Sequence, residues 1–175
     1  YVMLIMMMAG ATFGLMLISN CRTLVTDLGA EVALAATAVT VLALFNALGR
    51  VGCGTISDKL GRINTLTIMI CIGIVGLIIC AVASSVALFI VGICLVGLAF
   101  GSFMGVYPGF CAEQFGPKNN GVNYGIMFIG FALAGIIGPQ ILLQLGTPTA
   151  YYVAIGLGVV GLIMSFIYRA MSKAK

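Results

Sequence analysis

The sequence predicts an all-α membrane protein with six transmembrane helices. Of its 175 residues, 62% are hydrophobic and 7% are charged, and the mean hydropathy is +1.25. Soluble domains carry roughly 25% charged residues, so this chain has too few charges to cover a surface in water. Its apolar runs are continuous and do not alternate in strand-like segments, which argues against a β-barrel. We therefore expect the chain to lie in a lipid bilayer.

The composition also limits the kinds of site that the chain can form. The six cysteines are scattered without a Cys-x-x-Cys pair and the chain has no histidine, so we expect neither a metal site nor a disulfide framework. The net charge of +4 would suit nucleic acid, but the positive residues cluster at the ends of the predicted helices, where they orient a membrane protein. We expect no nucleic-acid partner and no cofactor.

Six runs have the roughly 20 mainly apolar residues that a membrane span requires. They are 1–20, 33–56, 63–83, 86–110, 121–144 and 149–169. If Tyr1 is cytoplasmic, seven of the eight Lys and Arg residues fall on the cytoplasmic side, as the positive-inside rule requires. We therefore expect both ends of this segment to be cytoplasmic, in a plasma (inner) membrane. The chain enters a span directly at Tyr1, which we expect of a piece of a longer protein.

The first run is rich in methionine, which packs readily against irregular neighbours, and we expect ordinary core packing there. Asp27 and Glu31 follow this run. We expect both at the start of the second helix, where negative charge interacts favourably with the helix dipole.

The second run carries a polar pair, Asn46 and Arg50, which are four residues apart and so share one helical face. If the span ends near Ile56, Arg50 lies roughly 9 Å inside it at 1.5 Å per residue. An arginine facing lipid costs about 2.5–3.5 kcal/mol at mid-depth on insertion scales. Arg50 could reach out to the interface as an anchor. The interpretation we favour places it in a water-filled cavity, where it binds an anion together with Asn46.

The segment from Gly54 to Arg62 fits the pattern G-x-x-x-D-[RK]-x-G-[RK]. This motif resembles the loop between the second and third helices of each half of the major facilitator superfamily of secondary transporters. Gly61 permits a tight turn, Asp58 is expected to cap the next helix or pair with a cation, and Lys59 and Arg62 hold the loop in the cytoplasm. The resemblance implies a six-helix half with two inverted three-helix repeats, and a loop that latches the halves in one conformational state.

The third run and the sixth offer no functional signal. The fourth contains glycines at a spacing of four, which predict close helix packing: Gly97, Gly101, Gly105 and Gly109. Pro108 lacks a backbone donor and is expected to weaken this helix near its cytoplasmic end. In the fifth run, Gly138 and Pro139 are expected at a hinge or a close contact.

Three segments resemble the carboxyl-terminal half of the oxalate/formate antiporter and monocarboxylate carriers: LFNALGRVGCGTISDKLGR, GSFMGVYPGFCAEQFG and NNGVNYGIMFIGFALAGIIGP. Carriers of this group place an arginine eight residues before the loop aspartate, and Arg50 matches it. The resemblance thus implies that Arg50 binds a carboxylate. Where oxalate carriers have a lysine this chain has Phe131, and its fourth-helix aromatic positions hold Phe100 and Met104. One cation favours a substrate with one carboxylate and an apolar remainder.

We therefore expect half of a twelve-helix carrier that moves a monocarboxylate such as lactate, pyruvate or formate by alternating access, with a missing amino-terminal six-helix half as its partner. The expected substrate-binding residues are Arg50, Asn46, Phe100, Met104, Tyr107 and Phe131. The same fold carrying a sugar, a drug or oxalate stays open, as does a non-transporting membrane assembly subunit. An intramembrane enzyme is not expected, because the chain lacks histidine and has no acidic pair within its spans. Proton symport and anion exchange both remain open.

Overall fold

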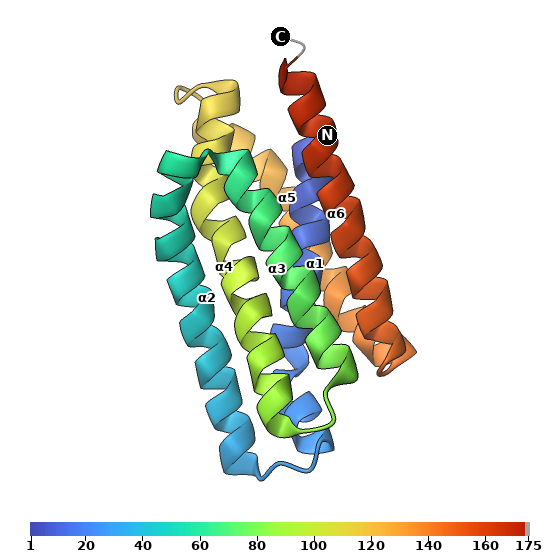
Figure 1. Ribbon diagram of the computed structural model, residues 1–175. Coiled ribbons are helices and arrows are strands. Elements are labelled where there is room, and N and C mark those ends of the chain that lie inside the picture. The colour runs from blue at the N-terminus through green and yellow to red at the C-terminus, as the bar shows by residue number, and fades with distance from the viewer. Residues whose placement is uncertain (174–175) are drawn as a thin grey trace.

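The structure is a computed structural model that describes residues 1–173, and this part of the chain forms six helices (Figure 1). They are α1 (Val2–Asp27), α2 (Val32–Leu60), α3 (Arg62–Val82), α4 (Val86–Phe115), α5 (Asn120–Leu145) and α6 (Thr149–Lys173). All six are long and apolar enough to cross a membrane. The all-α, six-span fold class predicted from composition is therefore confirmed.

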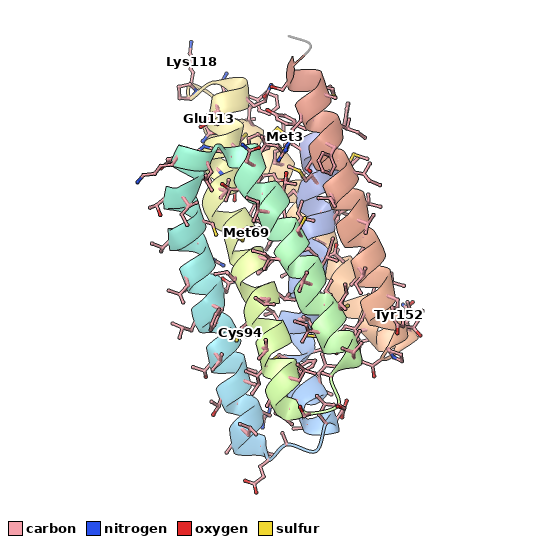
Figure 2. The ribbon with its side chains drawn as sticks, in the orientation of Figure 1. Met3, Met69, Cys94, Glu113, Lys118 and Tyr152 are labelled. Carbon is pink, nitrogen blue, oxygen red and sulfur yellow. The ribbon has the colours of Figure 1, made fainter. Side chains whose placement is uncertain are left out.

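The helices run alternately up and down, so each end of the bundle collects the same kind of connection (Figure 1). The N-terminus, the end of α6, and the α2–α3 and α4–α5 connections meet at one end, which we call the charged end. Glu113 and Lys118 lie there, whereas Tyr152 lies near the opposite end (Figure 2). Asp58, Lys59 and Arg62 belong to the same end, because they flank the α2–α3 turn.

Four helices end four or more residues beyond the expected runs, α2 at Leu60 and α6 at Lys173 by four residues each, and α1 and α4 by more. α1 continues past residue 20 to Asp27, and α4 continues past residue 110 to Phe115. Asp27 therefore ends α1 instead of starting α2, and Glu31 alone precedes α2 as its N-cap residue. Hydropathy marks only where a helix leaves lipid, while its internal hydrogen bonds can continue beyond that point.

α1 and α4 form the centre of the bundle. In each of them 61% of the spanning window is buried, compared with 28% in α2 and in α5. Phe13 of α1 meets Phe103 of α4 edge to face, with ring centroids 6.3 Å apart. One turn along α4, the hydroxyl of Tyr107 donates to the carbonyl oxygen of Met3 at 3.1 Å. α2 and α5 therefore border this core and leave much of their surface open.

α4 approaches α2 through the glycines spaced by four residues. A Cβ added at Gly101 would overlap the carbonyl oxygen of Asn46, and one added at Gly105 would overlap that of Arg50. Gly97 also approaches Leu42 of α2, although less closely, and Gly109 faces Arg62 of α3 instead. Small residues permit such backbone-to-backbone approach between membrane helices. The packing thus fixes the α2 backbone at Asn46 and Arg50, the polar pair predicted to bind the ligand.

Candidate functional site

An open groove of about 360 Å³ lies between α1, α2, α4 and α5. Its lining residues are Leu15, Ile18, Val39, Leu42, Ala43, Asn46, Arg50, Phe100 and Phe131. The walls are aliphatic and aromatic, and Asn46 and Arg50 supply the polar side chains. A ligand in this groove would therefore meet a cation and an amide within apolar surroundings.

Asn46 orients the guanidinium of Arg50. The Nε–H of Arg50 donates to Oδ1 of Asn46 at 2.9 Å, across one turn of α2. Within residues 1–173, the terminal nitrogens Nη1 and Nη2 of Arg50 make no hydrogen bond or ion pair with another side chain. Arginine binds carboxylates through a planar fork of N–H donors. One edge of this fork is therefore held by the protein, and the terminal donors are available to a ligand.

The amide nitrogen of Asn46 is buried and has no hydrogen-bond partner in the described part of the chain. Its orientation follows from the hydrogen bond to Arg50, because Nε–H can only donate and so must face the amide oxygen. A buried donor without a partner costs about 1–3 kcal/mol. Asn46 thus keeps an unpartnered donor among the residues that line the groove.

An aromatic ladder extends from the groove along α5. Phe100 and Phe131 stack with ring centroids 6.0 Å apart, Phe131 stacks on Phe128 at 4.6 Å, and Tyr124 lies 5.5 Å from Phe128. Sequence reasoning missed Phe128 and Tyr124, although a spacing of four and then three residues along α5 indicates a shared helical face.

Tyr107 and Met104 are predicted in the substrate site, and neither is among the residues that line the groove. Tyr107 is fully buried, and its hydroxyl donates a hydrogen bond to the carbonyl oxygen of Met3. Its ring stacks on that of Phe103, with centroids 5.8 Å apart. One helical turn separates Phe103 from Tyr107, so both face α1 and neither lines the groove. Met104 is half-buried against the main core and is not among the groove residues.

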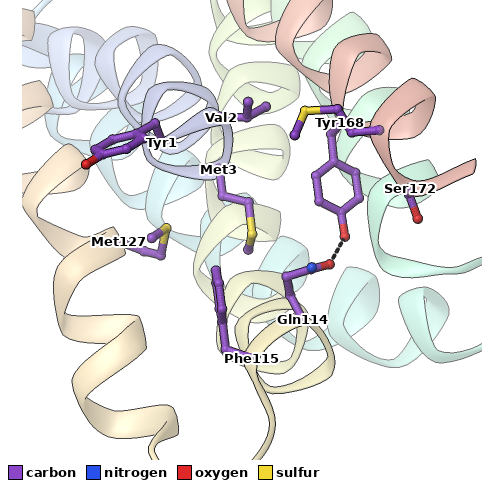
Figure 3. A pocket seen from close by; sticks show the side chains of 9 residues that line it. Tyr1, Val2, Met3, Gln114, Phe115, Met127, Tyr168 and Ser172 are labelled. Carbon is purple, nitrogen blue, oxygen red and sulfur yellow. Dashed lines mark hydrogen bonds between the residues drawn. The ribbon is translucent and has the colours of Figure 1, made fainter. Parts of the chain in front are cut away.

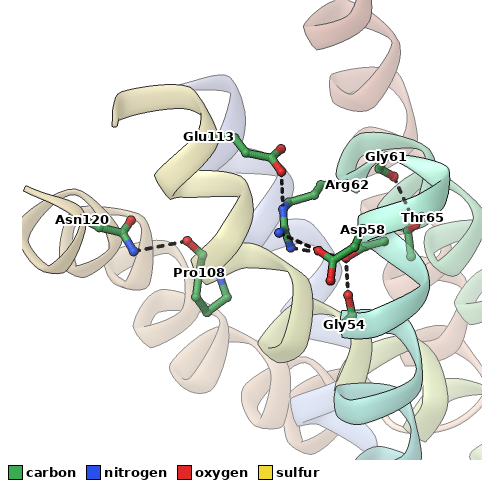
Figure 4. Close-up of polar contacts among 9 residues, drawn as sticks. Gly54, Asp58, Gly61, Arg62, Thr65, Pro108, Glu113 and Asn120 are labelled. Carbon is green, nitrogen blue, oxygen red and sulfur yellow. Dashed lines mark hydrogen bonds and ion pairs between the residues drawn. The ribbon is translucent and has the colours of Figure 1, made fainter. Parts of the chain in front are cut away.

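Arg62 is the centre of a polar network at the charged end (Figure 4). Its Nη2 pairs with Oδ1 of Asp58 at 2.8 Å and its Nε pairs with Oε1 of Glu113 at 2.7 Å. Its Nη1 donates to Oγ of Ser57 at 3.3 Å. A Cβ at Gly109 would overlap the guanidinium, so this glycine leaves the space that Arg62 occupies. The network joins α2, α3 and α4.

The turn between α2 and α3 consists of Gly61, whose φ of +84° lies in the left-handed region that glycine adopts without strain. Of the two roles considered for Asp58, the structure shows pairing with a cation, and α3 begins without a side-chain cap. A Cβ added at Gly54 would lie 3.6 Å from the carbonyl oxygen of Gly105, which is an ordinary contact distance. Lys59 is exposed.

A separate pocket of about 230 Å³ opens at the charged end between α1, α4, α5 and α6 (Figure 3). The residues around it are Tyr1, Val2, Met3, Gln114, Phe115, Met127, Tyr168, Met171 and Ser172. None of these side chains is charged, and the Tyr168 hydroxyl donates a hydrogen bond to the side-chain oxygen of Gln114. This pocket offers no counter-charge to an organic anion, so the groove beside Arg50 is the better candidate site.

The chain matches known proteins of one family. Residues 2–175 match the family model described as Major Facilitator Superfamily. Over 138 residues the chain is 33% identical to an uncharacterized MFS-type transporter, YhjX, of Escherichia coli (strain K12), which covers 78% of this chain and 34% of that protein. Over 118 residues it is 28% identical to the MFS-type efflux pump MMF1 of Pseudozyma antarctica (strain T-34), covering 66% of this chain and 22% of that one.

The fold is also similar to a solved structure, the in meso crystal structure of the POT family transporter PepTSo, with a TM-score of 0.79. That match covers 96% of this chain and 37% of the other, at 18% sequence identity. At this identity the likeness concerns the fold alone. The chain thus spans between 22% and 37% of the length of these three proteins.

Proposed function

We infer the function from the family: the chain belongs to the major facilitator superfamily, whose model matches residues 2–175, and it is an integral, multi-pass part of a membrane transporter. We propose that it forms the carboxyl-terminal half of a twelve-helix carrier. The proposed substrate is a small organic anion with one carboxylate, of the lactate, pyruvate or formate type. Transport proceeds by alternating access, and the substrate binds between the two halves near the middle of the membrane.

The observation that carries this proposal is the orientation of Arg50 by Asn46 in an otherwise apolar groove. A carboxylate presents two coplanar oxygens, and the free terminal nitrogens of the guanidinium match them. Hydrogen bonds between charged partners are about twice as strong as neutral ones. Because Asn46 fixes the side chain before the substrate arrives, less conformational freedom is lost on binding.

The groove walls favour a substrate with an apolar remainder. Phe100 and Phe131 stack at the groove, Leu42 also lines it, and Arg50 is the one cation among its described lining residues. A dicarboxylate would place its second charge against these side chains and lose hydration without compensation. A monocarboxylate directs its single charge at Arg50 and its apolar part at the rings.

We propose that the missing amino-terminal half covers the open side of the groove. The chain spans 34% of the length of the E. coli relative, and the helices flanking the groove, α2 and α5, are the least buried of the bundle. Exposed apolar side chains continue along both helices, among them Leu48, Val51, Ile129 and Leu133. We further propose that the charged end is cytoplasmic in a plasma membrane, because Lys and Arg residues gather there.

We base the proposed energy coupling, anion exchange or proton symport, on the charged residues that line the groove. No acidic side chain is among the residues that line it. Anion exchange requires no titrating group in this half, so we favour it over proton symport. Proton coupling would need a carboxyl group from the other half.

A second candidate substrate is a larger amphipathic organic anion, exported from the cell. The sequence similarity to an MFS-type efflux pump and the aromatic ladder from Phe100 to Tyr124 favour it. The Arg50 site would serve both substrates, and the size of the apolar part would distinguish them.

Transport in proteoliposomes tests the proposal directly. The full-length protein is reconstituted, and uptake of labelled lactate, pyruvate and formate is compared with uptake of larger aromatic acids. We expect Arg50→Ala to lower carboxylate affinity about 10- to 100-fold, the equivalent of about 1.5–3 kcal/mol for hydrogen bonds to a charged group. Arg50→Lys should restore little, because an ammonium lacks the planar fork. Lys118→Ala is the control, since this exposed cation lies in the α4–α5 connection, and normal uptake by Arg50→Ala would exclude Arg50 from the site.

A further inference from the structure

A second basic pocket lies at the charged end, between the start of α3 and the end of α6. Its volume is about 380 Å³, and its lining residues are Ile63, Asn64, Tyr168, Arg169 and Ser172. It shares no residue with the groove around Arg50. The proposed carrier function does not use it.

Arg169 differs from the exposed cations of this end because its guanidinium is held by the protein. Its Nη2 donates to Oγ1 of Thr67 on α3 at 3.0 Å, and its Cζ lies 5.7 Å from the centroid of the Phe166 ring. Its Nε is buried and has no partner within residues 1–173. The positive charge is therefore partly removed from water at a fixed position.

No described carboxylate compensates this charge. Asp58 and Glu113 both pair with Arg62, and these are the ion pairs of the described chain. A partly desolvated cation without a counter-ion is costly, and an anion beside it offsets that cost. The pocket is thus poised to bind an anion, and Asn64 and Ser172 add neutral polar groups at its rim.

We propose that this pocket binds the phosphate group of an anionic phospholipid. Basic pockets between transmembrane helices at the membrane surface bind such headgroups. Below the pocket, exposed apolar side chains follow both helices into the span, namely Ile68 on α3 and Ile163 and Phe166 on α6. These side chains provide a surface for acyl chains, which a free phosphate ion would not use.

Native mass spectrometry of the purified full-length protein tests the site. Dioleoylphosphatidylglycerol is titrated, and bound lipids are counted for the wild type, Arg169→Ala and Lys118→Ala. We expect Arg169→Ala to weaken lipid binding about fivefold or more, in line with the contribution of one basic residue near a membrane surface. Lys118→Ala removes an exposed cation from the same end and should bind like the wild type. Equal binding by Arg169→Ala and Lys118→Ala would overturn the proposal.

Thermal unfolding distinguishes the two possible sources of phosphate. We expect phosphatidylglycerol to raise the melting temperature of the wild type, and inorganic phosphate at the same concentration to leave it unchanged. An equal rise with inorganic phosphate would mean that the site takes free phosphate, and the lipid assignment would fail.

Two further variants keep the test decisive. Ser172→Leu fills the pocket rim while leaving Arg169 and its bond to Thr67 in place, so it should reproduce the loss of lipid even if Arg169→Ala folds poorly. Unchanged lipid binding by Ser172→Leu would count against the pocket. Arg50→Ala should bind lipid normally, which separates this site from the carboxylate groove.

Discussion

The side-chain oxygen of Asn46 accepts a hydrogen bond from Nε of Arg50 at 2.9 Å, one turn along the same helix. This bond defines which donors of Arg50 remain for a ligand, and it makes the chemistry of residue 46 decisive. An amide is neutral and leaves the positive charge of the guanidinium available. A carboxylate at this position would neutralise it.

Asn46→Asp should therefore impair carboxylate binding more than Asn46→Ala does. The introduced carboxylate would pair with Arg50 and compete with the substrate, and we expect at least a tenfold loss of affinity, equivalent to about 1.4 kcal/mol. Asn46→Ala removes only the positioning bond and should cost less. The dissociation constant of the carboxylate is measured for each variant of the full-length protein by isothermal titration calorimetry. Equal losses in both variants would mean that the charge of Arg50 is not used in binding.

Phe131→Lys should move the preference from monocarboxylates toward dicarboxylates. Phe131 lines the groove together with Arg50, so a lysine there would add a second cation to the same space. We expect oxalate to compete better for transport and lactate to compete worse than in the wild type. Phe131→Leu, which keeps the site apolar, serves as the control. Unchanged competition by oxalate in Phe131→Lys would show that residue 131 does not set substrate charge.

The fold could be predicted because the bilayer imposes a simple rule on each segment. About 20 apolar residues are needed per span, and the six runs found by that rule correspond to the six described helices. The rule fails at helix ends, as at Asp27 and Phe115. A helix that has left the lipid keeps its internal hydrogen bonds, so its last turns carry no hydropathy signal.

Periodicity within one helix predicted the pair of Asn46 and Arg50, whereas Phe100 and Phe131, which lie on other helices and also line the groove, were predicted from the family resemblance. A spacing of four placed Asn46 beside Arg50, and the structure contains that hydrogen bond. The direction that Tyr107 faces depends on how α4 is rotated against α1, which no single helix encodes. The same holds for Arg169 and Thr67, whose contact joins residues 102 positions apart. Such pairings follow from tertiary packing, which sequence periodicity does not reveal.

Gly101→Ala should destabilise the protein, because the added Cβ would overlap the carbonyl oxygen of Asn46. Overpacking of this kind costs about 1–3 kcal/mol. Gly156→Ala on α6 is the matched control, because nothing in the described chain lies within 4 Å of its Cβ position, and alanine favours a helix over glycine by about 1 kcal/mol. Unfolding in mixed detergent micelles measures both. A Gly101→Ala protein as stable as Gly156→Ala would show that α2 can move away from α4 without loss.

Two tyrosine variants separate the sequence expectation from the structural placement. Tyr107→Phe removes a buried hydrogen bond to Met3, so we expect a loss of stability of about 0.5–1.5 kcal/mol with unchanged substrate affinity. Tyr124→Phe removes a hydroxyl from the end of the aromatic ladder that extends from the groove, so we expect a lower affinity for carboxylates long enough to reach it and little change in stability. Each variant loses one oxygen atom, which makes them matched controls for one another. Parallel measurements of melting temperature and substrate competition would show this division, and a loss of affinity confined to Tyr107→Phe would return that residue to the site and contradict the packing of α4 against α1.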